Sequence, residues 1–370
     1  MLKRLSMLRP ARAVVKKHQS KQASLSTILK HRERLKPGLF VSTSARVWRH
    51  WGTPLPEHLR LSKGGRLGTL DGGLAARFGG SFRASTQSAI PPCFFLSGSH
   101  GIRHGFPLVV AASRESLIFL DPETARVHRT PGTGRRFSDE YVNLRDGYAQ
   151  HIPSPRFDIL DGGSLLYEEY CTGGLFRNLP IGARLSVVRY FFDRFTDLVR
   201  SKGRDSSYLQ VSAAVERASN ARLPASLRKV LEDTDISALA HNWPLVPSQS
   251  DFHHANLIMM NDRAVVIDFP SWGMSLQPYF VDIVGLPLQA GDDIRRAMLH
   301  GEFDDKLAQL VSATGDSPSE LLAWKAGLLA ARCLVVASSG TSHPANFDDS
   351  VFEREVARIW SHSWPVSSVL

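Results

Sequence analysis

The stretch from residue 249 to residue 269 constrains the fold of this 370-residue chain more than any other part of it. It contains two short apolar runs, residues 257–260 and 264–267, with a polar segment containing adjacent Asn and Asp between them. Short apolar runs that flank such a turn predict a buried β-hairpin. We therefore expect this part of the chain to fold back on itself, so that residues before the first run lie near residues after the second.

Three polar side chains flank the predicted hairpin. Asp251 and Asn256 precede it and Asp268 follows it, so the hairpin should bring two carboxylates and one carboxamide to the same end of a sheet. Clustered carboxylates repel one another unless a cation lies between them, and oxygen donors of this kind suit Mg²⁺. Two alternatives stay open: the side chains could satisfy backbone donors of the loop, or His253 and His254 could bind zinc, although adjacent histidines point in different directions.

The pattern Asp-x-x-x-x-Asn, an apolar hairpin and then Ile-Asp-Phe resembles the catalytic core of the protein-kinase-like phosphotransferases, most closely the aminoglycoside phosphotransferase and choline kinase branch. The resemblance implies that Asp251 is the catalytic base, Asn256 a metal ligand and Asp268 the principal metal-binding carboxylate. Asp282 lies in a segment that resembles the family's downstream Tyr-x-Asp-Leu, where the Asp is mainly structural. The sequence departs from the family at Gln249, where the usual residue is a His that braces the loop.

Composition is that of a globular protein, with 43% hydrophobic and 22% charged residues. The length is sufficient for two lobes, each with its own core. Three widely spaced cysteines form neither a disulfide framework nor a metal-binding pattern, which favours a reducing compartment. No apolar run reaches the length of a membrane span. We therefore expect a cytoplasmic protein.

The net charge of +10 is concentrated in the N-terminal region. Residues 1–66 contain 16 Lys and Arg against two Glu, a balance of +14, which leaves the remainder at −4. We expect residues 1–85 to form a basic, partly flexible extension that includes the glycine-dense stretch 63–82. An Arg-rich, acid-poor composition fits an organelle transit peptide, an arm that contacts an anionic surface at a membrane, or a solvated tail. It predicts no specific nucleic-acid recognition.

Three short strands with tight turns are predicted at residues 107–111, 116–120 and 125–129. This meander resembles the opening of a kinase small lobe. Ser113 and Ser116 lie at its first turn, where the family folds a loop over the nucleotide phosphates. The resemblance therefore assigns both serines to nucleotide binding.

The third strand should carry the lysine that neutralises the phosphates, but the sequence has no Lys between Lys63 and Lys202. By strand alternation, Arg129 shares a face with the apolar Val127. Arg129 is the strongest substitute for the lysine, because its charge is permanent and it can bind phosphate bidentately. His128 is the weaker substitute, since it would be only partly charged at neutral pH.

A helix is predicted at about residues 138–149. Its run containing Glu140 resembles the family's helix with a Glu-x-x-x-Leu core, and the resemblance implies that Glu140 pairs with Arg129 and holds it in place. The alternative is a carboxylate that only faces solvent. The next strand, residues 165–170, leads to Thr-Gly-Gly, and the resemblance places the connection between the lobes at 169–174.

In the family the backbone of this connection holds the adenine edge, which assigns Glu169 and Tyr170 to nucleotide binding. Any edge strand that leaves a domain would have a similar sequence. Further along the chain, helices are predicted at residues 181–202, 292–313, 318–338 and 349–361.

Together these observations predict an α+β, two-lobe protein-kinase-like fold with a basic N-terminal extension. The small antiparallel-sheet lobe should occupy residues 86–168 and the mainly helical lobe residues 175–370. The expected activity is ATP- and Mg²⁺-dependent transfer of the γ-phosphoryl group to a hydroxyl of a small molecule. The alternative is a binding or regulatory protein that keeps the fold and has lost catalysis, as the residues at 249 and 129 would allow.

Overall fold

A computed structural model describes residues 28, 34–35, 38–42, 47–50, 93–96, 105–111, 116–131, 135–202, 207–210, 242–249, 252–260, 263–269 and 274–315. The chain divides into two compact units, each built from separate segments. The first comprises Met1–Asp139, Pro155–Thr172 and Ser271–Gly273, and the second comprises Glu140–Ser154, Gly173–Pro270 and Met274–Leu370. Helices and strands are both present, as the sequence predicts.

The first unit is built on one sheet. Eight of the described strands form it, and every neighbouring pair is antiparallel. In sheet order these strands are β3 (Cys93–Leu96), β1 (Gly38–Ser42), β2 (Val47–His50), β4 (Leu108–Ala111), β5 (Leu117–Asp121), β6 (Arg126–Arg129), β8 (Leu165–Glu169) and β7 (Phe157–Leu160). The predicted three-strand meander is confirmed, because β4, β5 and β6 are consecutive neighbours.

Strands β1 and β2 lie within residues 1–85, the segment predicted to be an extension. They pair with each other, and β2 pairs with β4, so the sheet begins well before residue 86. Phe40 and Trp48 are fully buried and share a core cluster with Val109 and Phe119. Aromatic burial on this scale stabilises the sheet through the hydrophobic effect. Most of the basic segment 1–66 lies outside the described residues.

The second unit contains two small sheets and the described helices. One sheet has the order β10 (Tyr208–Gln210), β11 (Asn242–Ser248), β14 (Ser275–Pro278), and the other β13 (Arg263–Val266), β12 (Leu257–Met260), β9 (Gly174–Leu175). The helices are α5 (Asp139–Ala149), α6 (Ile181–Lys202), α9 (Val281–Gln289), α10 (Asp292–Leu299) and α11 (Asp304–Ser312). Short 3₁₀ turns occur in this unit at Phe176–Asn178 and His254–Asn256, and in the first unit at Asp161–Gly163.

The predicted helices at 138–149 and 181–202 are confirmed as α5 and α6. The single helix expected at 292–313 is wrong, because the structure has two helices there, α10 and α11. Gly301, between them, has a φ of 94°, a left-handed conformation that glycine adopts without steric cost and that ends a helix. The helices expected at 318–338 and 349–361 lie outside the described residues.

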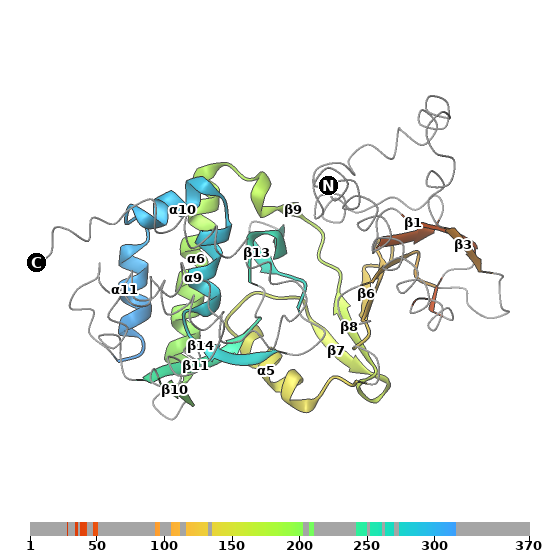
Figure 1. Ribbon diagram of the computed structural model, residues 1–370, viewed down its shortest axis with the longest axis horizontal. Helices are drawn as coiled ribbons and strands as arrows, with labels where there is room; N and C mark the ends of the chain where they lie inside the picture. The colour runs from red at the N-terminus through yellow and green to blue at the C-terminus, as the bar shows by residue number, and fades with distance from the viewer. Residues whose placement is uncertain are drawn as a thin grey trace, which may run out of the picture. The chain divides into compact units, whose positions relative to one another are not determined.

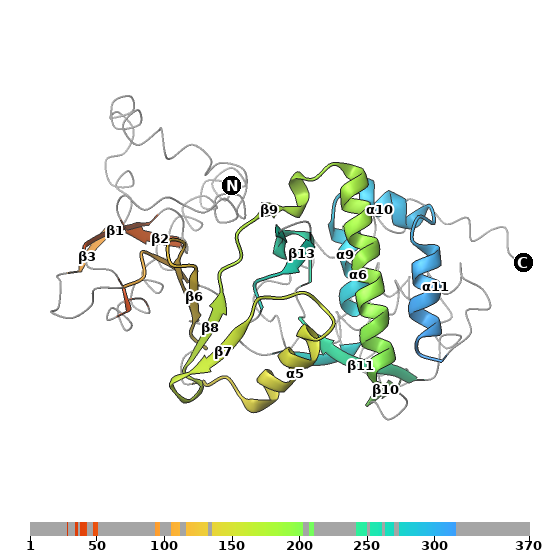
Figure 2. The same cartoon turned by 180° about the vertical axis from the view of Figure 1, so that it is seen from behind.

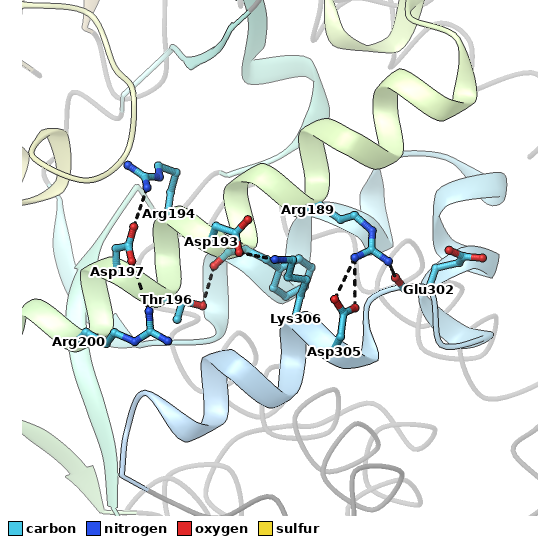
Figure 3. A network of polar contacts seen from close by, with 10 residues as sticks. Arg189, Asp193, Arg194, Thr196, Asp197, Arg200, Glu302, Asp305 and Lys306 are labelled. Carbon is cyan, nitrogen blue, oxygen red and sulfur yellow. Dashed lines mark hydrogen bonds and ion pairs between the residues drawn. The ribbon is translucent and has the colours of Figure 1, made fainter.

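Helix α6 organises the packing of the second unit (Figure 1). Its apolar residues recur at helical spacing and are buried, among them Val188, Phe192 and Phe195. Figure 2 shows α6 beside α9 and α11 from the opposite side. Ion pairs also link α6 to α11 (Figure 3), for example Asp193 Oδ1 with Lys306 Nζ at 2.6 Å. Such partly exposed pairs contribute little, so apolar packing dominates here.

Within the described part of the chain, no helix is both long enough and apolar enough to cross a membrane.

Candidate functional site

The predicted hairpin is confirmed as β12 and β13, which pair in register from Leu257 opposite Val266 to Met260 opposite Arg263. Asn256 directly precedes β12, and its backbone oxygen accepts a hydrogen bond from Ile267 N at 2.8 Å. That bond extends the hairpin by one pair and brings the backbone of Asn256 next to the residue before Asp268. The backbones of Asn256 and Asp268 therefore lie at one end of the hairpin, and the convergence of their side chains with Asp251 stays a prediction.

The environments of the two side chains differ. Asn256 is buried, with 6% of its surface exposed, whereas Asp268 is exposed. Asp268 also has a φ of 61°, the left-handed region that non-glycine residues rarely adopt. Such conformations persist where the surrounding structure holds them, and they are often found at functional sites. Asp251, the proposed base, lies outside the described residues, although Gln249 and Phe252 on either side of it are described.

Gln249 joins the segment before Asp251 to the exit of the hairpin. Its side-chain Nε2 donates to the backbone oxygens of Ile267 at 2.8 Å and Asp268 at 3.3 Å. Both acceptors are carbonyls, which fixes the orientation of the amide. Gln249 is fully buried, so its side chain links the hairpin exit to the loop at the position where the resembling family has its bracing His.

Asp282, near the start of α9, holds the same segment from the other side. Its Oδ1 accepts from Ser248 Oγ at 2.8 Å, and its Oδ2 accepts from Gln249 N at 2.9 Å. Hydrogen bonds to a buried carboxylate are stronger than those between neutral groups. Asp282 thus has the structural role that the resemblance implies, and it fixes where the chain leaves β11 toward Asp251.

Phe269, the residue after Asp268, packs against helix α5. The Arg145 guanidinium lies over its ring, 4.3 Å from the centroid, and the Tyr148 ring meets it edge-on at 5.6 Å. Both α5 side chains are fully buried. Burial, and then the negative charge of Asp282, raise the pKa of the Tyr148 hydroxyl well above its usual value. A cation over an aromatic face stabilises such a contact, so α5 fixes Phe269 and the backbone next to Asp268.

His253 has a local role. Its Nδ1 accepts a hydrogen bond from Ala255 N at 3.1 Å and caps the 3₁₀ turn that contains Asn256. Among the residues that the structure describes, no group of three or more His, Cys, Asp or Glu side chains is gathered as a metal site. Asn256 and Asp268 provide oxygen donors of the kind that Mg²⁺ prefers, and the donor chemistry at this end of the hairpin therefore fits magnesium.

In the first unit, Arg129 is the last residue of β6 and is 7% exposed. Its Nε contacts the Glu168 carboxylate on the adjacent strand β8, and Glu168 is 3% exposed. Glu140 is exposed on the first turn of α5, and its pairing with Arg129 stays a prediction. Ser116 is buried directly before β5, and Ser113 lies outside the described residues.

The predicted connection at 169–174 contains the boundary between the units, which falls between Thr172 and Gly173. The amides of Glu169 and Tyr170 donate to Arg156 O at 2.9 Å and Ala125 O at 3.3 Å. These N–H groups are therefore occupied, and an adenine edge would have to bond to other backbone groups here. Burial raises the pKa of the Tyr170 hydroxyl to about 12, so this hydroxyl is neutral at pH 7.

Gly173 is required by close backbone packing. A Cβ added to it would lie 1.9 Å from the backbone oxygen of Met259 on β12, while one added to Gly174 would meet nothing within 4 Å. Strand β9 lies beside β12, with Gly174 opposite Met259. Only glycine at 173 allows this approach, so the chain enters the second unit by packing directly on the hairpin.

No protein-family model matches the chain, and no curated protein sequence matches it. Solved structures that it resembles include a choline/ethanolamine kinase family protein from Mesorhizobium loti, with 17% identity over 68% of this chain and 86% of that one and a TM-score of 0.42. Aminoglycoside phosphotransferase APH(4)-Ia is 18% identical over 68% of this chain and 91% of that one, with a TM-score of 0.38. A glucosamine kinase is 15% identical over 69% and 76%, with a TM-score of 0.41.

These solved structures belong to the phosphotransferases that the sequence motifs resemble. At such identities and TM-scores the likeness carries no argument about this chain's reaction.

Proposed function

We propose that this protein is an ATP- and Mg²⁺-dependent phosphotransferase that moves the γ-phosphoryl group of ATP to a hydroxyl of a small molecule. The observation that carries the proposal is the braced hairpin, whose open end brings together Asn256 and the backbone next to Asp268. Gln249 ties that end to the segment leading to Asp251. A loop held at both ends positions side chains closely enough for phosphoryl transfer, which depends on positioning and charge stabilisation.

In this proposal Asp251 orients the acceptor hydroxyl and takes its proton as the hydroxyl oxygen forms a bond to the γ-phosphorus. The bond between the γ-phosphorus and its bridging oxygen breaks, and ADP leaves. Asn256 and Asp268 would hold Mg²⁺, which when bound would neutralise charge on the phosphate oxygens. The oxygen chemistry of both side chains supports this assignment.

The remaining roles concern ATP itself. Arg129 would neutralise phosphate charge, with Ser113 and Ser116 near the phosphates. The backbone around Glu169 and Tyr170 would receive the adenine. A permanently charged guanidinium is suited to phosphate, which supports Arg129 over His128, since burial first and then the charges of Arg126 and Arg34 lower the pKa of His128 to about 4.

The test is ADP release in the presence of ATP, Mg²⁺ and a panel of hydroxylated small molecules. We expect the wild-type protein to turn over ATP with at least one acceptor. We expect the Asp251→Ala variant to lose turnover and to keep Mg²⁺-dependent ATP binding, measured by thermal stabilisation. The Asp146→Ala variant, changed at an exposed position of α5, is the control. If the wild-type protein binds ATP but releases no ADP with any acceptor, the binding-protein alternative is favoured.

A further inference from the structure

A buried ion pair links two neighbouring strands in the first unit. Arg129 Nε contacts Glu168 Oε2, and the register of β6 and β8 sets Glu168 opposite Val127 and Leu166 opposite Arg129. Residues opposite each other, and those two positions along, project from the same face of a sheet. Arg129 and Glu168 are therefore diagonal neighbours on one face, separated by 39 positions in the sequence.

The face that carries this pair is largely apolar. Leu120 and Val127 belong to a buried cluster there, with Ile118 packed against it, and Ile118 is opposite Arg129 in the register of β5 and β6. A buried ion pair among aliphatic side chains is weak evidence for stability, since apolar residues of similar volume often replace such a pair without loss. Its presence on this face therefore calls for another explanation.

His128, the other candidate cation, lies on the opposite face of β6, where its surroundings disfavour a charge. His128 packs 4.6 Å from the Phe106 ring and 5.8 Å from the Tyr167 ring. It lies on the other side of the strand from Arg129 by alternation. A histidine in this aromatic environment is neutral at pH 7, as the lowering of its pKa indicates. Of the two candidates on this strand, the guanidinium alone carries charge at neutral pH.

A carboxylate on Nε fixes the plane of a guanidinium, whose five N–H bonds form a rigid fork. Strand β8 ends at Glu169, and Glu169 and Tyr170 form the segment proposed to receive adenine. Glu168, which contacts the Arg129 guanidinium, directly precedes that segment. Orientation of this kind favours bidentate contact with a phosphate.

From this geometry we infer that Glu168, on the strand next to Arg129, is the positioning residue that orients Arg129 toward the phosphates of bound ATP. The inference rests on the proposed function and deepens it, because it gives this chain a strand-to-strand pair in the role that the resemblance assigned to Glu140 on helix α5. Glu168 does not touch the reacting atoms and acts through Arg129.

The experiment compares the dissociation constants of ATP and of adenosine, both with Mg²⁺, in wild-type protein and in variants. The Arg129→Met/Glu168→Met double variant replaces the pair with apolar side chains, so the fold should be kept. We expect it to weaken ATP binding at least about tenfold, the effect of losing about 1.4 kcal/mol, and to leave adenosine binding within about twofold. A purely structural role would move both constants together.

Single variants sharpen the assignment. Glu168→Gln should shift the ratio of the two constants in the same direction as the double variant, and Glu123→Gln, at an exposed position in the turn between β5 and β6, should leave it unchanged. The inference is overturned if the double variant binds ATP like the wild type, if both ligands weaken equally, or if Glu140→Gln shifts the ratio and Glu168→Gln does not.

Failure of the inference and failure of the proposed function give different results. If the wild-type protein binds no Mg·ATP, the proposed function is wrong, and there is no bound phosphate toward which Glu168 could orient Arg129. If the wild-type protein binds ATP and releases ADP, and the double variant does both equally well, only the role of Glu168 is lost.

Discussion

The hairpin of β12 and β13 and the strand pair of β6 and β8 hold their polar side chains in different ways. At the hairpin, polar side chains bond to backbone groups, as Gln249 does to Ile267 and Asp268, and the Asp268 side chain is exposed. In the strand pair, Arg129 bonds to the side chain of Glu168, and both are buried. The first arrangement fixes the backbone around a carboxylate; the second fixes the orientation of a cation.

This difference predicts different responses to mutation. A group held by the backbone can lose its own chemistry while the fold is kept. A group held by another side chain should depend on that partner, because removing one member leaves a buried charge.

The largest effect is expected at the exposed carboxylate. Asp268→Asn should lower ATP turnover by about 10²–10³-fold, since the loss of one group that stabilises charge in the transition state has effects of this size. Thermal unfolding should change little, because the Asp268 side chain is exposed. Steady-state kinetics and a melting curve measure the two effects, with Asp146→Asn as the exposed control. A large fall in melting temperature would show that Asp268 is structural.

The next largest effect is expected at Gln249, whose side chain braces the exit of the hairpin. Gln249→Leu keeps the side-chain volume but removes both hydrogen bonds to the hairpin exit, which should cost about 1–2 kcal/mol of stability. It should also lower turnover about tenfold or more through misplacement of Asp251. Gln249→His introduces the residue type that is usual in the family the sequence resembles, and it should retain more activity than Gln249→Leu. Urea unfolding and turnover of Gln150→Leu, at an exposed position after α5, provide the control. Equal activity of Gln249→Leu and wild type would contradict the bracing role.

A smaller, purely steric effect is expected where β9 meets the hairpin. Gly173→Ala should destabilise the protein by about 1–3 kcal/mol, the usual range for overpacking, because its Cβ would meet Met259 O at 1.9 Å. Gly174→Ala is the matched control, since nothing lies within 4 Å of its Cβ. If both variants unfold at the same urea concentration, the close approach of β9 to β12 is not present in solution.

The smallest effect is a pH dependence in the first unit. His128 has a pKa of about 4 in the folded protein against 6.5 as its ordinary value, chiefly because of burial. The unfolded chain therefore binds this proton more readily than the fold, so the contribution is fully present above pH 6.5 and is lost as pH falls toward 4. His128→Phe, which suits the aromatic contacts to Phe106 and Tyr167, should lose less stability in this window. The urea midpoints of the wild type and the variant at pH 7 and pH 4.5 measure this loss. An equal change in midpoint between the two pH values for both proteins would contradict the prediction.

The sequence was most informative where the interacting residues are close along the chain. Met260 pairs with Arg263 across the turn of the hairpin, and the two apolar runs on either side of that turn predicted both β12 and β13. The pair of Arg129 and Glu168 spans 39 positions, with α5 and β7 between its members. Strand pairing across such an insertion leaves no local periodicity, so the sequence pointed to Glu140, the acidic residue on the predicted helix.

Two further features were hidden for different reasons. The strongly basic composition of the N-terminal segment obscured β1 and β2, which contain the buried Phe40 and Trp48. Gln249 was interpreted as a departure from a family pattern, but its amide can donate to a carbonyl as an imidazole N–H does. A substitution that preserves the hydrogen bond is invisible when only residue identity is compared.

The central claim is that Asn256 and Asp268 hold a magnesium-bound nucleotide beside Asp251. Calorimetric titration of ATP into the wild-type protein and into Asp268→Asn, each with Mg²⁺ and with EDTA, tests it most directly. We expect ATP binding by the wild type to weaken strongly in EDTA, and ATP binding by the variant to be weak in both conditions. Equal ATP affinity with and without Mg²⁺, or full Mg²⁺ dependence in the variant, would contradict it.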